Sequence, residues 1–65
     1  MEITLNGEPR EVAQGTTLAS LLAEVGVRPP YAVELNRQVC PKGRHGETPL
    51  GEGDVVEIVT IVGGG

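Results

Sequence analysis

The sequence predicts an α+β domain in which a mixed sheet of four to five strands carries one main helix on one face. Three observations support this: the chain has only 65 residues, residues 2–5 and 31–35 alternate polar and apolar side chains, and leucines recur at helical spacing between these two segments. A domain of this size buries only about 60% of its unfolded surface. Because Tyr31 is the only aromatic residue, Leu, Val and Ile must form the core, and a deep catalytic cleft is not expected.

The first two strands should form a hairpin. Residues 2–5 alternate polar and apolar side chains, and Asn6-Gly7 is the two-residue signal for a type I′ turn. The return strand should run over residues 8–13. It should lie at the edge of the sheet, because Pro9 cannot donate a ladder hydrogen bond.

One amphipathic helix is predicted next. Thr16 or Thr17 can cap its start by accepting a bond from a free backbone N–H, and Gly26 is suited to end it. Pro29-Pro30 prevents any continuation. The apolar positions fall at i, i+3, i+4 and i+7 and form a single stripe: Leu18, Leu21, Leu22 and Val25.

The middle of the chain predicts shorter elements. Residues 31–35 alternate as a third strand, and Arg37-Gln38 should turn the chain toward a short fourth strand at Val39-Cys40. Residues 42–47 are polar, contain two glycines and are interpreted as a loop. In the tight connection over residues 49–54, Leu50 should fill the core.

Residues 55–62 form the strongest predicted strand, and their near-continuous apolarity is typical of a central strand with parallel neighbours. No hairpin can join the first and last strands, so we expect them to pair in parallel, with the helix packed across one face. This arrangement is the ubiquitin-like β-grasp. We expect the β-grasp domain to span residues 1–62 and residues 63–65 to form a flexible glycine tail.

The alternation along this last strand predicts which side chains face outward. If Glu57 faces water, Val59 and Ile61 lie on the same side of the sheet as Glu57. Exposed apolar residues beside a functional tail are typical of a docking patch, to which we also assign Val62. The alternative is that a neighbouring loop covers them.

Composition excludes several classes of function. The net charge is −4 and the five basic residues are scattered, which argues against nucleic-acid binding. The single cysteine, Cys40, cannot hold an iron–sulfur cluster, so a β-grasp ferredoxin is excluded, and we expect no metal site. Neither a signal peptide nor a membrane-spanning run is visible, so we expect a cytoplasmic protein with no membrane partner.

Several other polar residues have ordinary interpretations. For Cys40, an inert core position is favoured over a reactive thiol, and His45 is interpreted as a solvated loop residue. Asp54 is a better candidate for forming a turn than for binding a metal. The remaining acidic residues should form a solvated surface that steers the domain toward basic partners: Glu2, Glu8, Glu11, Glu24 and Glu52.

The glycines at residues 63–65 carry the candidate chemistry. A tail without Cβ atoms can enter a narrow channel in a partner enzyme. An α-carboxyl group has a reference pKa of about 3.3–3.7, so it is ionised at neutral pH. The resulting carboxylate becomes a good acyl donor only after activation, for example by transfer of AMP from ATP. The alternative is a frayed end with no function.

Taken together, these segments resemble the sulfur carrier proteins of thiamine biosynthesis, which supply sulfur for the thiazole ring. The resemblance covers essentially the whole chain, in the order typical of the family. The matching segments are residues 3–8, Thr16-Thr17-Leu18 with Leu21-Leu22, residues 32–36, Pro49-Leu50, residues 53–58 and residues 62–65.

The resemblance implies a carrier that enzymes act on, with no catalytic residue and no bound cofactor of its own. An E1-like adenylyltransferase would activate Gly65 with ATP and magnesium, while Gly63 and Gly64 give access. A cysteine desulfurase or another persulfide donor would convert Gly65 to a thiocarboxylate. A thiazole synthase would then accept the sulfur.

Two alternatives remain open at this point. Within the same class, the chain could be the small subunit of molybdopterin synthase or another thiocarboxylate sulfur carrier. From another class, it could be a non-catalytic β-grasp interaction module with an inert tail. Chemistry at Gly65 that depends on ATP separates the carriers from the interaction module.

Overall fold

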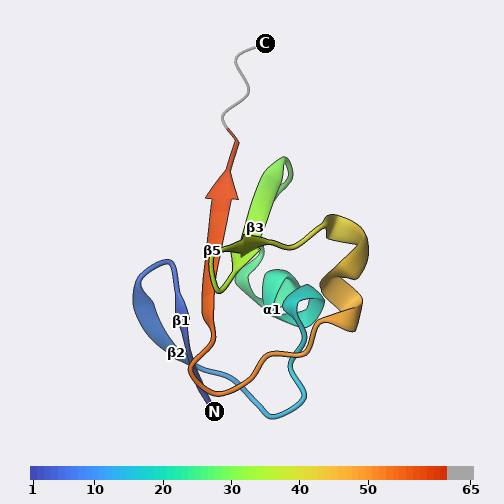
Figure 1. Cartoon of the computed structure of the whole chain (residues 1–65). Helices are drawn as coiled ribbons and strands as arrows, with labels where there is room; N and C mark the ends of the chain where they lie inside the picture. The colour runs from blue at the N-terminus through green and yellow to red at the C-terminus, as the bar shows by residue number, and fades with distance from the viewer. Residues whose placement is uncertain (62–65) are drawn as a thin grey trace.

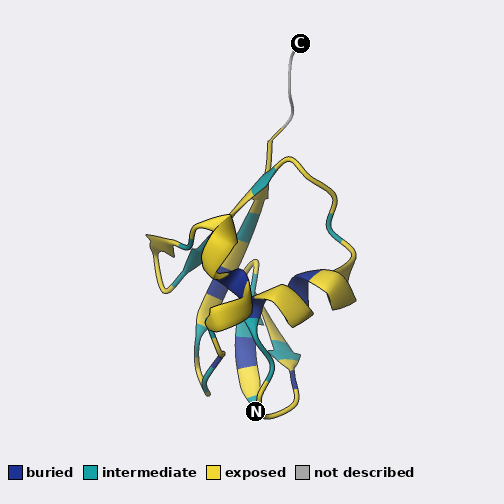
Figure 2. Cartoon of the chain, turned by 90° about the vertical axis from the view of Figure 1, so that its right-hand side faces the viewer, coloured by how far each residue is buried: buried dark blue, intermediate teal, exposed yellow. Residues whose placement is uncertain are grey.

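The computed structural model describes residues 1–61, and within them a five-stranded sheet is covered on one face by an α-helix and a short 3-10 helix (Figures 1 and 2). The strand order is β2-β1-β5-β3-β4. The prediction of a mixed sheet with one main helix is confirmed. In chain order the elements are β1 Glu2–Leu5, β2 Glu8–Glu11, α1 Leu18–Val25, β3 Tyr31–Leu35, β4 Gln38–Val39, η1 Lys42–Glu47 and β5 Val55–Thr60.

The first hairpin forms as predicted. Asn6 and Gly7 have φ values of 50° and 83°, which are the positive angles that a type I′ turn requires at both central positions. Strands β1 and β2 pair antiparallel from this turn, and β2 lies at the edge of the sheet. It ends at Glu11, two residues earlier than expected, and Val12 then turns into the core.

Helix α1 begins and ends at residues that the sequence indicated. Of the two threonines, Thr17 is the N-cap: its hydroxyl accepts from the Ser20 N–H at 3.2 Å, and the Ser20 hydroxyl accepts from the Thr17 N–H at 2.9 Å. Gly26 ends the helix with φ at 77°, and its N–H donates to the Leu22 carbonyl. Val25, the last residue of the apolar stripe, stays 38% exposed.

The central position of β5 is confirmed. The prediction that both of its neighbours are parallel is right for β1 and wrong for β3. Strand β1 runs parallel to β5, with Thr4 opposite Val55 and Leu5 opposite Val56. Strand β3 runs antiparallel to it. The reason is that residues 40–54 return the chain to the end of the sheet at which β3 finishes, so β5 starts beside Leu35.

The predicted turn between β3 and β4 is one residue out of place. It lies at Asn36 and Arg37, with φ values of 51° and 69°, and not at Arg37-Gln38. Strand β4 is accordingly Gln38–Val39, and Cys40 follows it. Asparagine tolerates the left-handed conformation, and the Asn36 side chain is held there by hydrogen bonds to the connection that enters β5.

The segment predicted as a loop is the 3-10 helix η1, and the prediction for His45 is wrong. His45 is only 6% exposed, and its Nε2 lies 3.0 Å from the Cys40 carbonyl oxygen, to which it must donate because a carbonyl only accepts. The Thr48 hydroxyl donates to the Arg44 carbonyl and closes the last turn. Because η1 packs against α1, the His45 ring is covered.

A single aliphatic core lies between the sheet and the two helices (Figure 2). Leu50 is part of it, as predicted, because the Leu50 N–H bonds to the Thr16 carbonyl and fixes the connection against the start of α1. The buried residues are Ile3, Val12, Leu18, Leu21, Leu22, Val33, Leu50 and Val56.

We expect Thr17→Ala to destabilise the domain by about 1 kcal/mol, because the helix loses its side-chain acceptor at the N-cap. Chemical denaturation measures the change. Thr17→Ser keeps the hydroxyl and should retain most of the stability. Equal stability of the alanine and wild-type chains would show that the cap contributes nothing.

Candidate functional site

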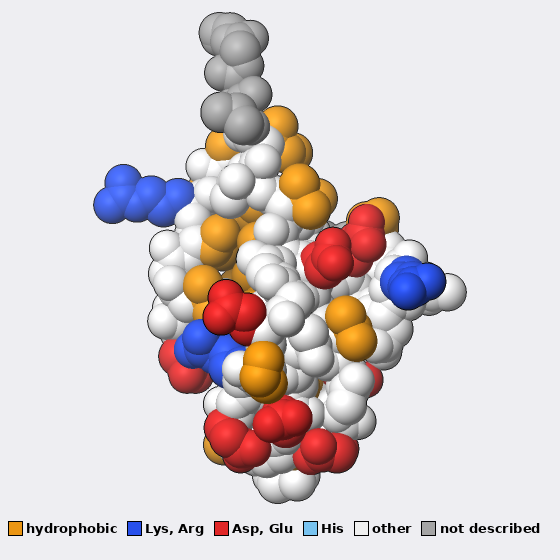
Figure 3. All heavy atoms as spheres, turned by 90° about the vertical axis from the view of Figure 1, so that its left-hand side faces the viewer, with side chains coloured by type: hydrophobic (Ala, Val, Ile, Leu, Met, Phe, Trp, Pro, Cys, Tyr) orange, Lys and Arg blue, Asp and Glu red, His pale blue; other side chains and the backbone are white. Residues whose placement is uncertain are grey.

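The candidate site is the face of the sheet that points away from α1, called the outer face below. The register of β3 and β5 sets Ala32 opposite Val59 and Glu34 opposite Glu57. Val33, between Ala32 and Glu34, and Val56, which precedes Glu57, are buried on the helix side. Figure 3 shows apolar side chains gathered near the end of this face at which β5 finishes, with acidic side chains further down. The predicted outward direction of Glu57 and Val59 is confirmed.

The two predicted docking residues in the described part of the chain are exposed. Val59 is 50% exposed and Ile61 is 52% exposed, so the alternative that a described loop covers them is wrong. The Ile61 N–H donates to the Pro30 carbonyl, which continues the ladder between β5 and β3 by one residue. Their role in docking stays a prediction.

The exposed apolar surface is larger than sequence reasoning found. Val39, on β4, lies opposite Glu34 of β3, and Val55 lies two residues before Glu57 on β5. Val39 and Val55 therefore face outward. Both are exposed. Finding Val39 requires the register of β4, which periodicity alone did not provide. Val55 has the same parity as Glu57 along the predicted strand, so the sequence already carried its signal. We call Val39, Val55, Val59 and Ile61 the apolar patch.

Two asparagine side chains hold β5 from its two sides. On the β1 side, Asn6 Oδ1 accepts from the Ile58 N–H at 2.8 Å. On the β3 side, Asn36 Oδ1 accepts from the Val55 N–H at 2.9 Å. Strand β1 ends at Leu5, so the Asn6 side chain extends the pairing beyond the end of the backbone ladder. These bonds fix the position and direction of the strand that carries the patch.

Asp54 organises the turn that enters β5. Its Oδ2 accepts from the Gly51 N–H at 2.7 Å, and its Oδ1 accepts from the Asn36 side-chain amide at 3.1 Å. The predicted turn-forming role is confirmed. Within residues 1–61, no group of three or more His, Cys, Asp or Glu side chains is placed to hold a metal ion.

Cys40 is half-buried and packs against the core. Its N–H donates to the Val33 carbonyl at 2.8 Å, and its Sγ lies 3.7 Å from the Thr48 hydroxyl. This environment suits a packing residue, as the sequence favoured.

The remaining predicted site residues lie outside the described part of the chain. These are Val62, assigned to docking, Gly63 and Gly64, assigned to access, and Gly65, assigned to carry sulfur. Their roles stay predictions, as does the boundary between domain and tail.

In residues 1–61, no helix combines the length and apolarity needed to cross a membrane.

A family model supplies the assignment that geometry alone cannot. The model of the ThiS family matches residues 3–65. The chain belongs to the ThiS family.

Individual relatives agree with this assignment. The chain is 42% identical over 64 residues to the sulfur carrier protein ThiS of Thermus thermophilus, which covers 97% of this chain and 98% of that relative. The crystal structure of the thiamine biosynthesis protein ThiS from Geobacter metallireducens superposes with a TM-score of 0.86, is 33% identical and covers 100% of both chains. The family resemblance and the β-grasp fold are therefore confirmed.

A second kind of relative is much longer. The chain is 46% identical over 66 residues to a thiazole synthase of Magnetococcus marinus. All of this chain is matched, but it spans only 20% of the length of that protein. A region similar to the whole ThiS-family chain therefore occurs within a protein named for thiazole synthesis.

We expect Asn6→Gly to weaken β5 locally. Glycine keeps the positive φ of the turn but removes the acceptor for the Ile58 N–H. The domain should lose about 1 kcal/mol, and the Ile58 amide should exchange its hydrogen faster. Unchanged protection of that amide would contradict the role assigned to the Asn6 side chain.

Proposed function

We propose that this chain is a sulfur carrier of thiamine biosynthesis and that it carries sulfur as a thiocarboxylate on Gly65. The observation that supports this most directly is the family match over residues 3–65, together with near-complete mutual coverage with the Thermus thermophilus sulfur carrier. The domain itself catalyses no step in this proposal. It presents an acyl group to enzymes that recognise its surface.

The first proposed step activates the carboxylate of Gly65. One carboxylate oxygen attacks the α-phosphorus of ATP, pyrophosphate leaves, and an acyl-adenylate forms. An E1-like adenylyltransferase with magnesium would catalyse this step, because the ionised carboxylate is a poor acyl donor until AMP is attached. Glycines at 63 and 64 present no side chain to the walls of such an active site.

The second proposed step replaces AMP with sulfur. The terminal sulfur of a persulfide, supplied by a cysteine desulfurase or another donor, attacks the acyl carbon and AMP leaves. A thiol then cleaves the sulfur–sulfur bond of the resulting acyl disulfide. This leaves the thiocarboxylate on Gly65 and a disulfide on the donor side.

The proposed acceptor is a thiazole synthase. Support comes from the Magnetococcus marinus relative, in which a region similar to this chain is part of a thiazole synthase. Joining two modules in one polypeptide raises their effective concentration toward each other, which is useful when one delivers a group to the other. For a separate chain, the outer face must provide the contact, and we assign docking to Val59, Ile61 and Val62.

We expect deletion of Gly65 to abolish sulfur transfer without unfolding the domain. Intact-protein mass spectrometry after expression with the thiamine-pathway enzymes should show the mass gain of one oxygen exchanged for sulfur on the wild-type chain alone. Denaturation of both chains controls for folding. Transfer by the truncated chain would overturn the proposal. A thiocarboxylate that thiazole synthase does not accept would favour another thiocarboxylate carrier.

We expect Val59→Asp and Ile61→Asp to weaken binding to the adenylyltransferase and to thiazole synthase at least about tenfold, because a charge then occupies the apolar patch. Calorimetric titration measures the affinity. Thr60→Asp is the matched control, since Thr60 is also exposed but points to the other side of β5. Affinities equal to wild type for both patch variants would remove the patch from the proposed interface.

A further inference from the structure

Two glutamates lie directly opposite each other in the centre of the outer face. The antiparallel register of β3 and β5 pairs Glu34 with Glu57. Side chains at directly opposite positions have Cβ atoms about 4.5–5.5 Å apart, and like charges there are destabilising. Glu57 is exposed and Glu34 is partly exposed, so both carboxylates can be reached from outside. We call these two residues the glutamate pair.

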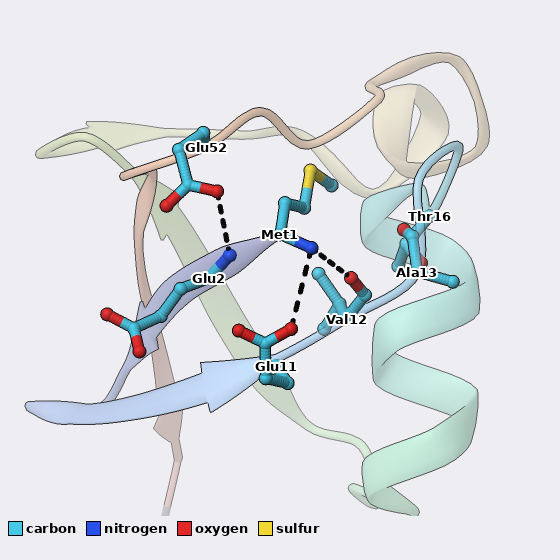
Figure 4. Close-up of polar contacts among 7 residues, drawn as sticks. All are labelled: Met1, Glu2, Glu11, Val12, Ala13, Thr16 and Glu52. Carbon is cyan, nitrogen blue, oxygen red and sulfur yellow. Dashed lines mark hydrogen bonds and ion pairs between the residues drawn. The ribbon is translucent and has the colours of Figure 1, made fainter.

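Neither member of the glutamate pair has a cationic partner within residues 1–61. Of the ion pairs found there, one joins Arg10 to Glu24 on the helix. The other joins the Met1 amino group to Glu11 at the edge of the sheet (Figure 4). The outward-facing positions of the five strands carry no Lys or Arg. They carry four glutamates, Glu2, Glu11, Glu34 and Glu57.

The glutamate pair is surrounded by the apolar patch. Along β5, Glu57 lies between the outward positions Val55 and Val59, and across the sheet Val39 is opposite Glu34. All three valines are exposed. An acidic centre with an apolar surround is complementary to a surface that presents one cation among apolar side chains. It would repel the phosphates of a nucleic acid.

We propose that the glutamate pair receives an arginine side chain of the protein partner that covers the outer face. A guanidinium group has five N–H donors in one plane and can bond both carboxylates at once through charge-assisted hydrogen bonds. Docking then converts a repulsion between Glu34 and Glu57 into two attractions to one cation, while the valines exclude water around it. This inference rests on the proposed function and specifies the chemistry of the partner surface.

The test compares Glu34→Gln and Glu57→Gln with Glu47→Gln, which removes an exposed charge from η1 on the helix side. Each chain is titrated into purified adenylyltransferase and into thiazole synthase, and its unfolding is measured alone. We expect the two outer-face variants to be as stable as wild type or more stable, since the repulsion is gone. We expect their affinity for at least one of the two enzymes to fall by about tenfold or more, with a weaker dependence on salt. Glu47→Gln should change neither property.

A structural role for these glutamates would lower stability and affinity together, and that result would overturn the inference. Wild-type affinity of both outer-face variants for both enzymes would overturn it as well, while leaving the proposed function intact. If wild type binds and the variants do not, but no thiocarboxylate forms, the proposed function fails and the arginine site stands. Failure of wild type to bind either enzyme overturns both.

Discussion

The hydrogen bonds from Asn6 and Asn36 to the backbone of β5 are the constraint on which the functional surface depends. Backbone pairing between β1 and β5 extends over only two residue pairs, which is short for a strand that must keep its direction. Both asparagines have positive φ values at the ends of strands that flank β5, where a short amide can reach the neighbouring backbone. Glycine would allow the same turns but could not supply these acceptors.

The small core explains why the outer face stays uncovered. The buried aliphatic side chains form one layer between the sheet and the helices α1 and η1, and a chain of 65 residues has little left to cover the other side. His45 is a buried ring in a chain with no Phe or Trp. Its Nε2 donates a hydrogen bond to the Cys40 carbonyl. Four of the five large hydrophobic residues that are exposed in the described chain consequently lie on or beside β5 and β4.

Local patterns predicted much of this fold, and the failures have physical causes. The first hairpin, the caps of α1 and the burial of Leu50 follow from residue types with strong conformational preferences. The direction of β3 relative to β5 does not follow from residue types, because the alternation of polar and apolar side chains is the same whether two strands run parallel or antiparallel. The sequence of η1 has no apolar periodicity that would predict a helix. The burial of His45 depends on the packing of η1 against α1, which the local sequence does not show.

For the candidate site, the alternation of side chains along β5 was enough to place Val59 on the outer face. The residues that lie opposite each other on neighbouring strands could not be predicted from the sequence. The pairing of Val39 with Glu34 depends on the register between β3 and β4, which the turn at Asn36 and Arg37 sets. The glutamate pair depends on the register between β3 and β5, which are far apart in the sequence. A turn without glycine gives a weak sequence signal. The error of one residue at this turn therefore hid the outward position of Val39.

The position of the patch relative to Gly65 limits how a partner can use this domain. Gly65 is four positions after Ile61, and at about 3.5 Å per position this distance along the chain is at most ~14 Å. An active site that takes the carboxyl group of Gly65 must therefore lie close to the end of β5, beside Val59 and Ile61. Under the proposed function, an adenylating enzyme and a sulfur acceptor both meet this requirement only by covering the same end of the domain. They would then bind in turn and not together, and each must dissociate before the next can act. A patch of a few valines and one isoleucine around two solvated carboxylates suits such an exchange, because charges at an interface raise the association rate while the small apolar area permits release.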